Sequence, residues 1–221
     1  MKIEEILQSR NIKEVVHFTT ERGLTGCAAT KTVLSRKRLD KNKYLSHIAS
    51  PVSKERKEAS QKFNKEEDWL DYINMSISEI NAHYYHAANG WFKESDAWWC
   101  IMSFTPEILT HEGVYFTTTN NIYTGVKRNK GIKGLQEMFA DKITRWSGNN
   151  VIRGSRASHL TTCEQAEVLY PSTLDMKFLN RVYVTNEDQA ASIYGTLRSL
   201  GFSNIDVIIK PEKFNGIPNA C

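Results

Sequence analysis

The sequence predicts an α+β protein whose 221 residues fold as one domain. Short segments rich in β-branched and aromatic residues, typical of strands, are separated by longer segments whose apolar residues recur with the period of a helix. The chain contains no internal repeat and no low-complexity linker that would divide it. A hydrophobic content of 40%, with 24% charged residues, is enough for a core in a soluble globular protein.

The first half of the chain begins with a helix, a strand and a second helix. Residues 2–8 predict one or two amphipathic helical turns, and residues 11–19 predict a strand that ends in His17-Phe18-Thr19. Residues 81–94 are expected to be irregular. From residue 52 to residue 80 the apolar spacing favours a helix, whose inner face would carry Phe63, Trp69, Leu70, Ile73 and Ile77.

The second half alternates between strands and helices. The polar segment from Trp146 to Thr161 contains glycine and arginine and predicts a loop. Asn186 is suited to cap the last helix and Gly201 to end it. Strands are predicted over residues 98–104, 113–119, 166–170, 181–185 and 206–210, and helices over residues 130–146 and 187–200.

Composition excludes several classes of protein. No run of about 18 apolar residues exists, so the sequence predicts no transmembrane helix, and the charged N-terminus indicates no signal peptide. Four scattered cysteines without a CxxC motif favour reduced thiols in a cytoplasmic protein over a disulfide framework or a zinc site. The net charge of +4 permits an anionic partner without requiring one.

The most informative stretch is the strand predicted from Ala166 to Tyr170, at whose start lie Gln165 and Glu167. Side chains two apart in a strand project from the same face, so a carboxamide and a carboxylate point into one space. A loop followed by a strand with Gln-x-Glu is one way to build an NAD-cleaving site. The same tripeptide also fits an edge strand with a solvated polar face.

Other residues can supply the remaining parts of such a site. Cleavage of the bond between nicotinamide and ribose passes through an oxocarbenium-like state, which a carboxylate stabilises. A histidine such as His17 and hydroxyls can orient the ribose and carboxamide, an aromatic ring can stack on nicotinamide, and an arginine can hold the pyrophosphate. Each residue also has a structural explanation: His17 as a core histidine, residues 115–119 as ordinary strand composition, and Arg56 as a solvated helix residue.

Two motifs resemble the DarT toxins, which are nucleic-acid ADP-ribosyltransferases of bacterial toxin–antitoxin and phage-defence systems. They are His17-Phe18-Thr19 followed by Gly23-Leu24, and Gln165-Ala166-Glu167-Val168-Leu169 followed by the strand of residues 181–185. The resemblance implies an ADP-ribosyltransferase-like fold with two small packed β-sheets that form an NAD cleft. It also implies a helical insertion after the first strand region, here approximately residues 50–95, in a single domain of residues 1–221.

The resemblance also implies roles for individual residues, with NAD as a substrate and no metal. Glu167 would be the catalytic glutamate, while Arg56 is the best match to the family's catalytic arginine and Arg38 competes with it. The residues expected to contact NAD are His17, Thr19, Tyr44, Tyr115 and Gln165. A toxin of this kind needs a cognate antitoxin, either a direct binder or an enzyme that reverses the modification.

The loop before the catalytic strand is expected to face the acceptor. Arginine, asparagine and tryptophan suit phosphate contact, base-edge hydrogen bonds and stacking on unpaired bases. The resemblance implies single-stranded DNA; RNA would use the same chemistry, and a protein acceptor is a weaker alternative. The residues expected to bind nucleic acid are Arg145, Trp146, Asn149, Arg153, Arg156 and His159.

Two hypotheses of other classes compete with the transferase. The first is a non-catalytic nucleic-acid-binding protein that uses the same basic segments. The second is a metal-dependent nuclease built on His83 and His86 with His111 or His159, although no nearby carboxylate–histidine pattern supports it. Gln165, as a neutral amide where a glutamate would suit a guanidinium acceptor, favours a base as the acceptor.

Overall fold

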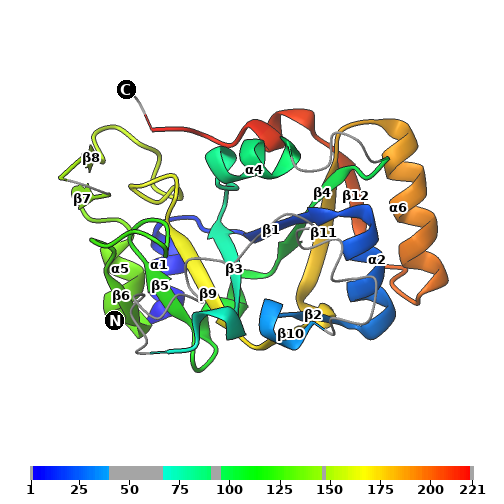
Figure 1. The fold of residues 1–221 in the computed structure, drawn as a ribbon, viewed down its shortest axis with the longest axis horizontal. Helices are drawn as coiled ribbons and strands as arrows, with labels where there is room; N and C mark the ends of the chain where they lie inside the picture. The colour runs from blue at the N-terminus through cyan, green and yellow to red at the C-terminus, as the bar shows by residue number, and fades with distance from the viewer. Residues whose placement is uncertain (1, 40–66, 91–95, 146–147, 220–221) are drawn as a thin grey trace.

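A central β-sheet organises the chain in the computed structural model, which describes residues 2–39, 67–90, 96–145 and 148–219 (Figure 1). The sheet has eight strands in the order β12-β11-β4-β1-β3-β9-β5-β6, and two further sheets have two strands each. Most neighbours are antiparallel, while β11 and β12 are parallel and are connected through a helix. The strands are β1 (Val15–Thr20), β2 (Thr32–Leu34), β3 (Tyr72–Ile77), β4 (Trp99–Phe104), β5 (Tyr115–Thr117), β6 (Arg128–Lys130), β7 (Lys142–Thr144), β8 (Asn150–Ile152), β9 (Glu167–Pro171), β10 (Thr173–Asp175), β11 (Leu179–Val184) and β12 (Asp206–Ile209).

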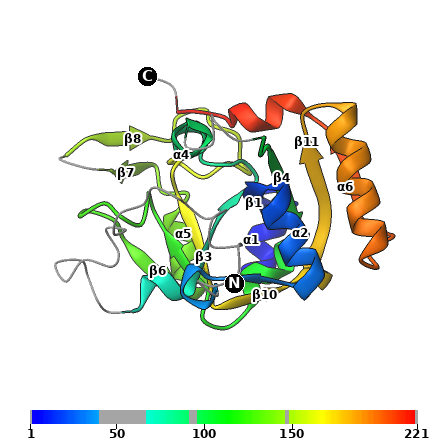
Figure 2. The same ribbon diagram turned by 45° about the vertical axis from the view of Figure 1, so that its right-hand side comes forward.

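Helices cover both faces of the sheet. Figures 1 and 2 show α2 and α6 beside one end of it and α1 and α5 beside the other. None of the helices in the described ranges has the length and apolar character needed to cross a membrane. The α-helices are α1 (Ile3–Ser9), α2 (Glu21–Thr30), α4 (Ala82–Asn89), α5 (Gly131–Glu137) and α6 (Glu187–Ser199), and the 3-10 helices are η1 (Arg36–Arg38), η3 (Trp69–Asp71), η5 (Pro106–Thr110), η6 (Met176–Phe178) and η7 (Pro211–Asn215).

The core lies on both faces because neighbouring residues of a strand point to opposite sides. Val15 belongs to the larger apolar cluster, with side chains of α1, α2, α5 and α6, whereas Val16 belongs to a smaller cluster with α4 and η7. All six residues of β4 are buried, as expected for a strand covered on both faces. The α+β class predicted from the sequence is therefore confirmed.

Most predicted elements in the second half are present. Asn186 accepts a hydrogen bond from the Gln189 amide at the start of α6, and Gly201, with φ of +88°, follows its end. Thr20 caps α2 by accepting a hydrogen bond from the Gly23 amide. The helix predicted for residues 130–146 is too long, because α5 ends at Glu137 and residues 142–144 form β7.

The helix predicted for residues 52–80 is wrong where the structure describes it as a strand. Residues 72–77 are not helical but form β3, a central strand, and residues 81–94 include α4, whose first turn Asn81 caps. Ile73 and Ile77 misled the prediction because a separation of four fits both a helix and a strand. Met75 between them reveals the alternation that the strand requires.

The two expected sheets are joined in the structure by β3. This strand pairs with β1 only through Val15↔Ile77 and Val16↔Ser76, and with β9 through residues 72–75. Its C-terminal end therefore belongs to one half of the sheet and its N-terminal end to the other. The two halves diverge where β1 continues past Val16.

Candidate active site

The divergence of β1 from β3 positions His17. The imidazole Nδ1 lies 2.8 Å from the carbonyl oxygen of Asn74 in β3, just beyond the last rung that the two strands share. Because a carbonyl oxygen only accepts, Nδ1 carries the proton, and Nε2 of the neutral ring is an acceptor. Burial lowers the pKa of His17 from its ordinary 6.5, partly opposed by the hydrogen bond to Asn74. The neutral ring can therefore accept a hydrogen bond from a ribose hydroxyl.

Glu167 opens β9 and is held on its backbone and its side chain. Its amide donates to Thr117 Oγ1 (3.0 Å) on the neighbouring β5, where the two residues are paired. Its Oε2 accepts a hydrogen bond from the Asn121 amide at 2.7 Å, and the residue is 7% exposed. The carboxylate is thus oriented before any substrate binds, as electrostatic stabilisation of a developing cation requires.

Gln165 contacts the same loop as Glu167. Tyr123 donates its hydroxyl proton to Gln165 Oε1 at 2.7 Å, two residues after Asn121. Both side chains therefore contact the segment between β5 and β6, although β9 begins at Glu167 and Gln165 precedes it.

Arg128 holds this loop in place. Its Nε donates to Asn121 Oδ1 and its Nη2 to the Asn121 carbonyl, both at 2.5 Å, and its guanidinium lies 5.0 Å from the centre of the Trp69 ring. The sequence alone does not single out Arg128, Asn121 or Tyr123 as residues of the site. The one available signal for Asn121 and Tyr123 was their position between two strands, immediately after Thr117-Thr118-Thr119.

Tyr115 lies farther along β5, in an aromatic cluster with Trp69 and Tyr72. Its ring centre is 5.3 Å from that of Trp69, its hydroxyl donates to Glu67 at 2.9 Å, and Lys130 Nζ lies 4.5 Å from its ring centre. The structure brings it into the same strand pair as Glu167 but gives it other partners. Its contact with NAD stays a prediction, as does that of Thr19 on β1.

The segment of residues 153–166, here called the upstream loop, connects β8 to β9. Arg153 and Arg156 direct their guanidinium groups into it: Arg153 donates to the carbonyls of Leu160 and Ala157, and Arg156 to that of Thr161. These contacts favour a structural role for the two arginines, which is to hold the loop. They do not favour the predicted contact with nucleic acid.

The other predicted acceptor residues occupy different positions. Arg145 pairs with Glu164 at 3.6 Å, Asn149 is exposed in the turn between β7 and β8, and the carbonyl of His159 accepts from Ser78 Oγ. Three predicted site residues lie outside the described residues: Tyr44, Arg56 and Trp146. Arg38 forms an ion pair with Asp71 through Nε at 2.9 Å.

The residues of the nuclease hypothesis do not come together. His83 and His86 are exposed on α4, and His111 hydrogen-bonds to the hydroxyl of Tyr170 at 2.7 Å. In the described ranges no group of three potential metal ligands is close enough to hold an ion.

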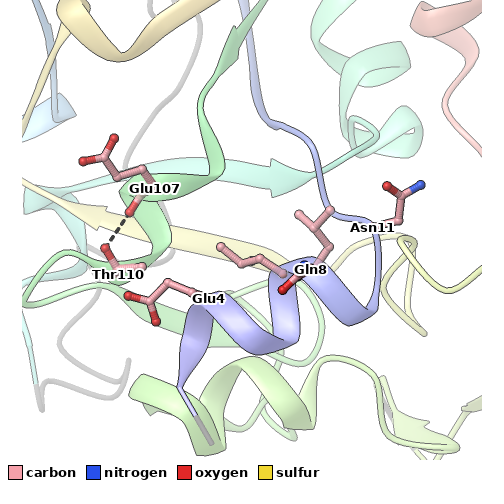
Figure 3. A pocket seen from close by; sticks show the side chains of 7 residues that line it. Glu4, Gln8, Asn11, Glu107 and Thr110 are labelled. Atoms are coloured by element: carbon pink, nitrogen blue, oxygen red, sulfur yellow. Dashed lines mark hydrogen bonds between the residues drawn. The ribbon is translucent and has the colours of Figure 1, made fainter.

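A pocket of about 550 Å³ lies elsewhere, between α1 and η5 (Figure 3). Its wall includes Glu4, Gln8, Glu107 and Thr110. None of its lining residues belongs to the arrangement around Glu167, so the pocket adds nothing to that site.

Comparison with known proteins places the chain in a family. The model of the family described as "ssDNA thymidine ADP-ribosyltransferase, DarT" matches residues 16–215. No curated protein matches the sequence.

Solved structures with 10–13% identity share the fold. Thermus sp. 2.9 DarT in complex with ADP-ribosylated ssDNA aligns with a TM-score of 0.64 at 10% identity over 92% of this chain and 96% of its own. The same protein in complex with carba-NAD+ aligns with a TM-score of 0.62 at 11% identity over 91% and 97%. Thermosipho africanus DarTG in complex with ADP-ribose aligns with a TM-score of 0.59 at 13% identity over 91% of this chain, which spans only 51% of that relative.

Proposed function

This chain belongs to the DarT family of ADP-ribosyltransferases, and from that premise we propose that it transfers ADP-ribose from NAD+ to thymidine in single-stranded DNA. The observation that carries the proposal is the Glu167 carboxylate, held by the Asn121 amide at 2.7 Å beside Gln165. A buried and oriented carboxylate at the start of β9 is what an oxocarbenium-like transition state needs.

The proposed reaction exchanges one bond at the anomeric carbon of the NAD ribose. The bond between this carbon and the nicotinamide nitrogen breaks, and nicotinamide leaves with the electron pair. A ring nitrogen of the base then forms the new bond and loses its proton. Thymidine offers a single ring N–H for this step. Glu167 stabilises the cation and can accept that proton.

His17 is proposed to orient the NAD ribose. Its Nδ1 proton is committed to the Asn74 carbonyl, so Nε2 can accept from a ribose hydroxyl without carrying a charge. A charged imidazolium beside a developing oxocarbenium ion would oppose cleavage, so the lowered pKa of His17 suits the reaction. The roles proposed for Arg56 in catalysis, Tyr44 in NAD binding and Trp146 in nucleic-acid binding rest on the sequence alone, because the three residues lie outside the described ranges.

The comparisons favour single-stranded DNA as the acceptor. Both the family description and the ssDNA complex of the Thermus protein favour it. RNA is a second acceptor to test, because a uracil ring offers the same N–H as thymine.

The test is to incubate the protein with labelled NAD+ and four acceptors: single-stranded DNA with thymidine, the same DNA without thymidine, its duplex, and the matching RNA. Label is expected on the first alone, and a Glu167→Gln protein should label it about 10²–10³-fold more slowly. Label on RNA or protein but not on DNA would contradict the proposed substrate. Equal labelling by the Glu167→Gln protein would contradict the mechanism.

We also propose that the chain is a cytoplasmic toxin that is restrained by an antitoxin and acts in antiviral defence. The likeness to DarTG supports this, although the chain spans about half of that relative. Expression in bacteria is expected to arrest growth, and the Glu167→Gln protein should not. Equal growth with both proteins would contradict the toxin role.

A further inference from the structure

Residues 217–219, here called the strap, cross beside the upstream loop. In Figures 1 and 2 this red segment runs from η7, past α4, toward the yellow loop that leads into β9. The family match ends at residue 215, so the strap lies beyond the matched residues.

Asn219 makes three hydrogen bonds with the upstream loop. Its Nδ2 donates to the Thr162 carbonyl at 2.7 Å, and its Oδ1 accepts from the Glu164 amide at 2.9 Å. Its own amide donates to Glu164 Oε2 at 2.6 Å. One side-chain amide therefore satisfies both a backbone acceptor and a backbone donor, one residue before Gln165.

Arg156 joins the loop and the strap from the other side. Its Nη1 donates to the Pro218 carbonyl at 3.0 Å and its Nη2 to the Ile217 carbonyl at 2.6 Å, while Nε donates to Thr161. Burial lowers the pKa of its guanidinium, as expected for a group surrounded by carbonyls in place of water.

The start of the strap is fixed in the core. Lys213 in η7 donates to the Ser78 carbonyl at 2.6 Å, and Ser78 Oγ in turn donates to the His159 carbonyl in the upstream loop. Gly216 follows with φ of +56°, and a Cβ there would lie 2.9 Å from the Ile80 carbonyl oxygen. The strap thus leaves η7 in a defined direction.

We propose that Asn219 is a positioning residue that, through the strap, holds the upstream loop in the conformation that accepts single-stranded DNA. This inference rests on the proposed function, in which that loop faces the acceptor. Arg156 is then a clamp between loop and strap, not a phosphate ligand.

The test compares Asn219→Ala with Asn215→Ala, which changes an exposed asparagine in the preceding η7. Asn219→Ala is expected to raise the KM for a thymidine oligonucleotide about tenfold, the effect of about two lost hydrogen bonds. The KM for NAD+ and the melting temperature should stay near those of the wild type. A chain that stops after Gly216 should also show a raised KM for the oligonucleotide with an unchanged KM for NAD+. Asn215→Ala should change neither KM.

Hydrogen exchange separates this inference from the proposed function. The Glu164 amide should exchange faster in the Asn219→Ala protein, because it loses its acceptor. If the wild type labels no oligonucleotide, the proposed function fails, and exchange still tests the strap. Unchanged exchange at Glu164, an unchanged oligonucleotide KM, or an equal rise in both KM values would each overturn the role of Asn219.

Discussion

Replacing Lys213 with methionine is expected to lower the free energy of unfolding by about 3 kcal/mol. The ammonium group is almost fully buried, with 6% of the side chain exposed, and it contacts Glu14 Oε1 at 2.7 Å, Glu79 Oε1 at 2.8 Å and the Ser78 carbonyl at 2.6 Å. Methionine keeps the length of the aliphatic chain and removes only the charge and its donors. Two carboxylates then remain in a largely buried site without their shared cation.

The magnitude follows from this burial. Removing one member of a buried ion pair typically costs about 3–5 kcal/mol. The side chains of Glu14 and Glu79 keep 15% and 17% exposure, so water can partly solvate them and the lower end applies. For a chain of this length that loss corresponds to a fall in melting temperature of about 6–12 °C.

The assay is thermal or urea unfolding of the two proteins over a range of pH. Burial by itself would raise the pKa of Glu14, but hydrogen bonds from Lys213 and Ser103 outweigh it and lower the pKa below the ordinary 4.5. A carboxyl with a lowered pKa stabilises the folded state above its unfolded pKa, and this stabilisation is lost as the pH falls through the folded value. The contribution of Glu14 to wild-type stability should therefore be full above about pH 4.5 and shrink in stronger acid, and the advantage of the wild type over the variant should shrink with it.

Lys177→Met is the matched control. This lysine is 67% exposed and pairs with Asp175 at 3.9 Å, so its removal should change stability by less than about 1 kcal/mol. A Lys213→Met protein as stable as the Lys177→Met protein would refute the argument that the buried cation holds η7 through Glu14 and Glu79.

Three further predictions concern the site and its support. Glu167→Gln should lower the rate of ADP-ribosyl transfer by about 10²–10³-fold with the melting temperature nearly unchanged, and a smaller loss would argue against electrostatic catalysis. Because burial lowers the pKa of His17 from 6.5, the unfolded chain binds more protons in mild acid and stability falls as the pH drops below that value; in urea unfolding, His17→Gln should remove this part of the pH dependence, and an equal slope would contradict it. Gly134→Ala should destabilise the protein by about 1–3 kcal/mol in the same assay, because a Cβ would lie 2.1 Å from the Asn129 carbonyl, whereas Gly195→Ala, with nothing within 4 Å of the added atom, should be neutral or stabilising.

Local sequence signals predicted the elements that depend on neighbouring residues. The helix capped by Asn186, the apolar run of β4 and the strand that begins near Glu167 each follow from side chains within one element. At β3 the signals were divided, because Ile73 and Ile77 fit two periods. Met75 between them favours the strand, and the pairing with β1 and β9 selects it.

Arg156 shows the limit of reading chemistry from residue type. An arginine in a polar loop before the strand of Glu167 predicts a phosphate contact, yet here its donors meet the carbonyls of Thr161, Ile217 and Pro218. The last two residues are about sixty positions away in the sequence, and no local pattern announces their approach.

The sequence by itself determined the fold class, the candidate catalytic Glu167 and the resemblance to the DarT family, since these depend on periodicity and on two short motifs. The tertiary structure decided how Glu167 is held, because Asn121, itself held by Arg128, reaches it only through the pairing of β5 with β6 and β9. It also decided that Arg156 connects the upstream loop to the strap. Hydrogen-bond partners far apart in the chain are chosen by the packing of the whole sheet, and that choice leaves no trace in the local order of residues.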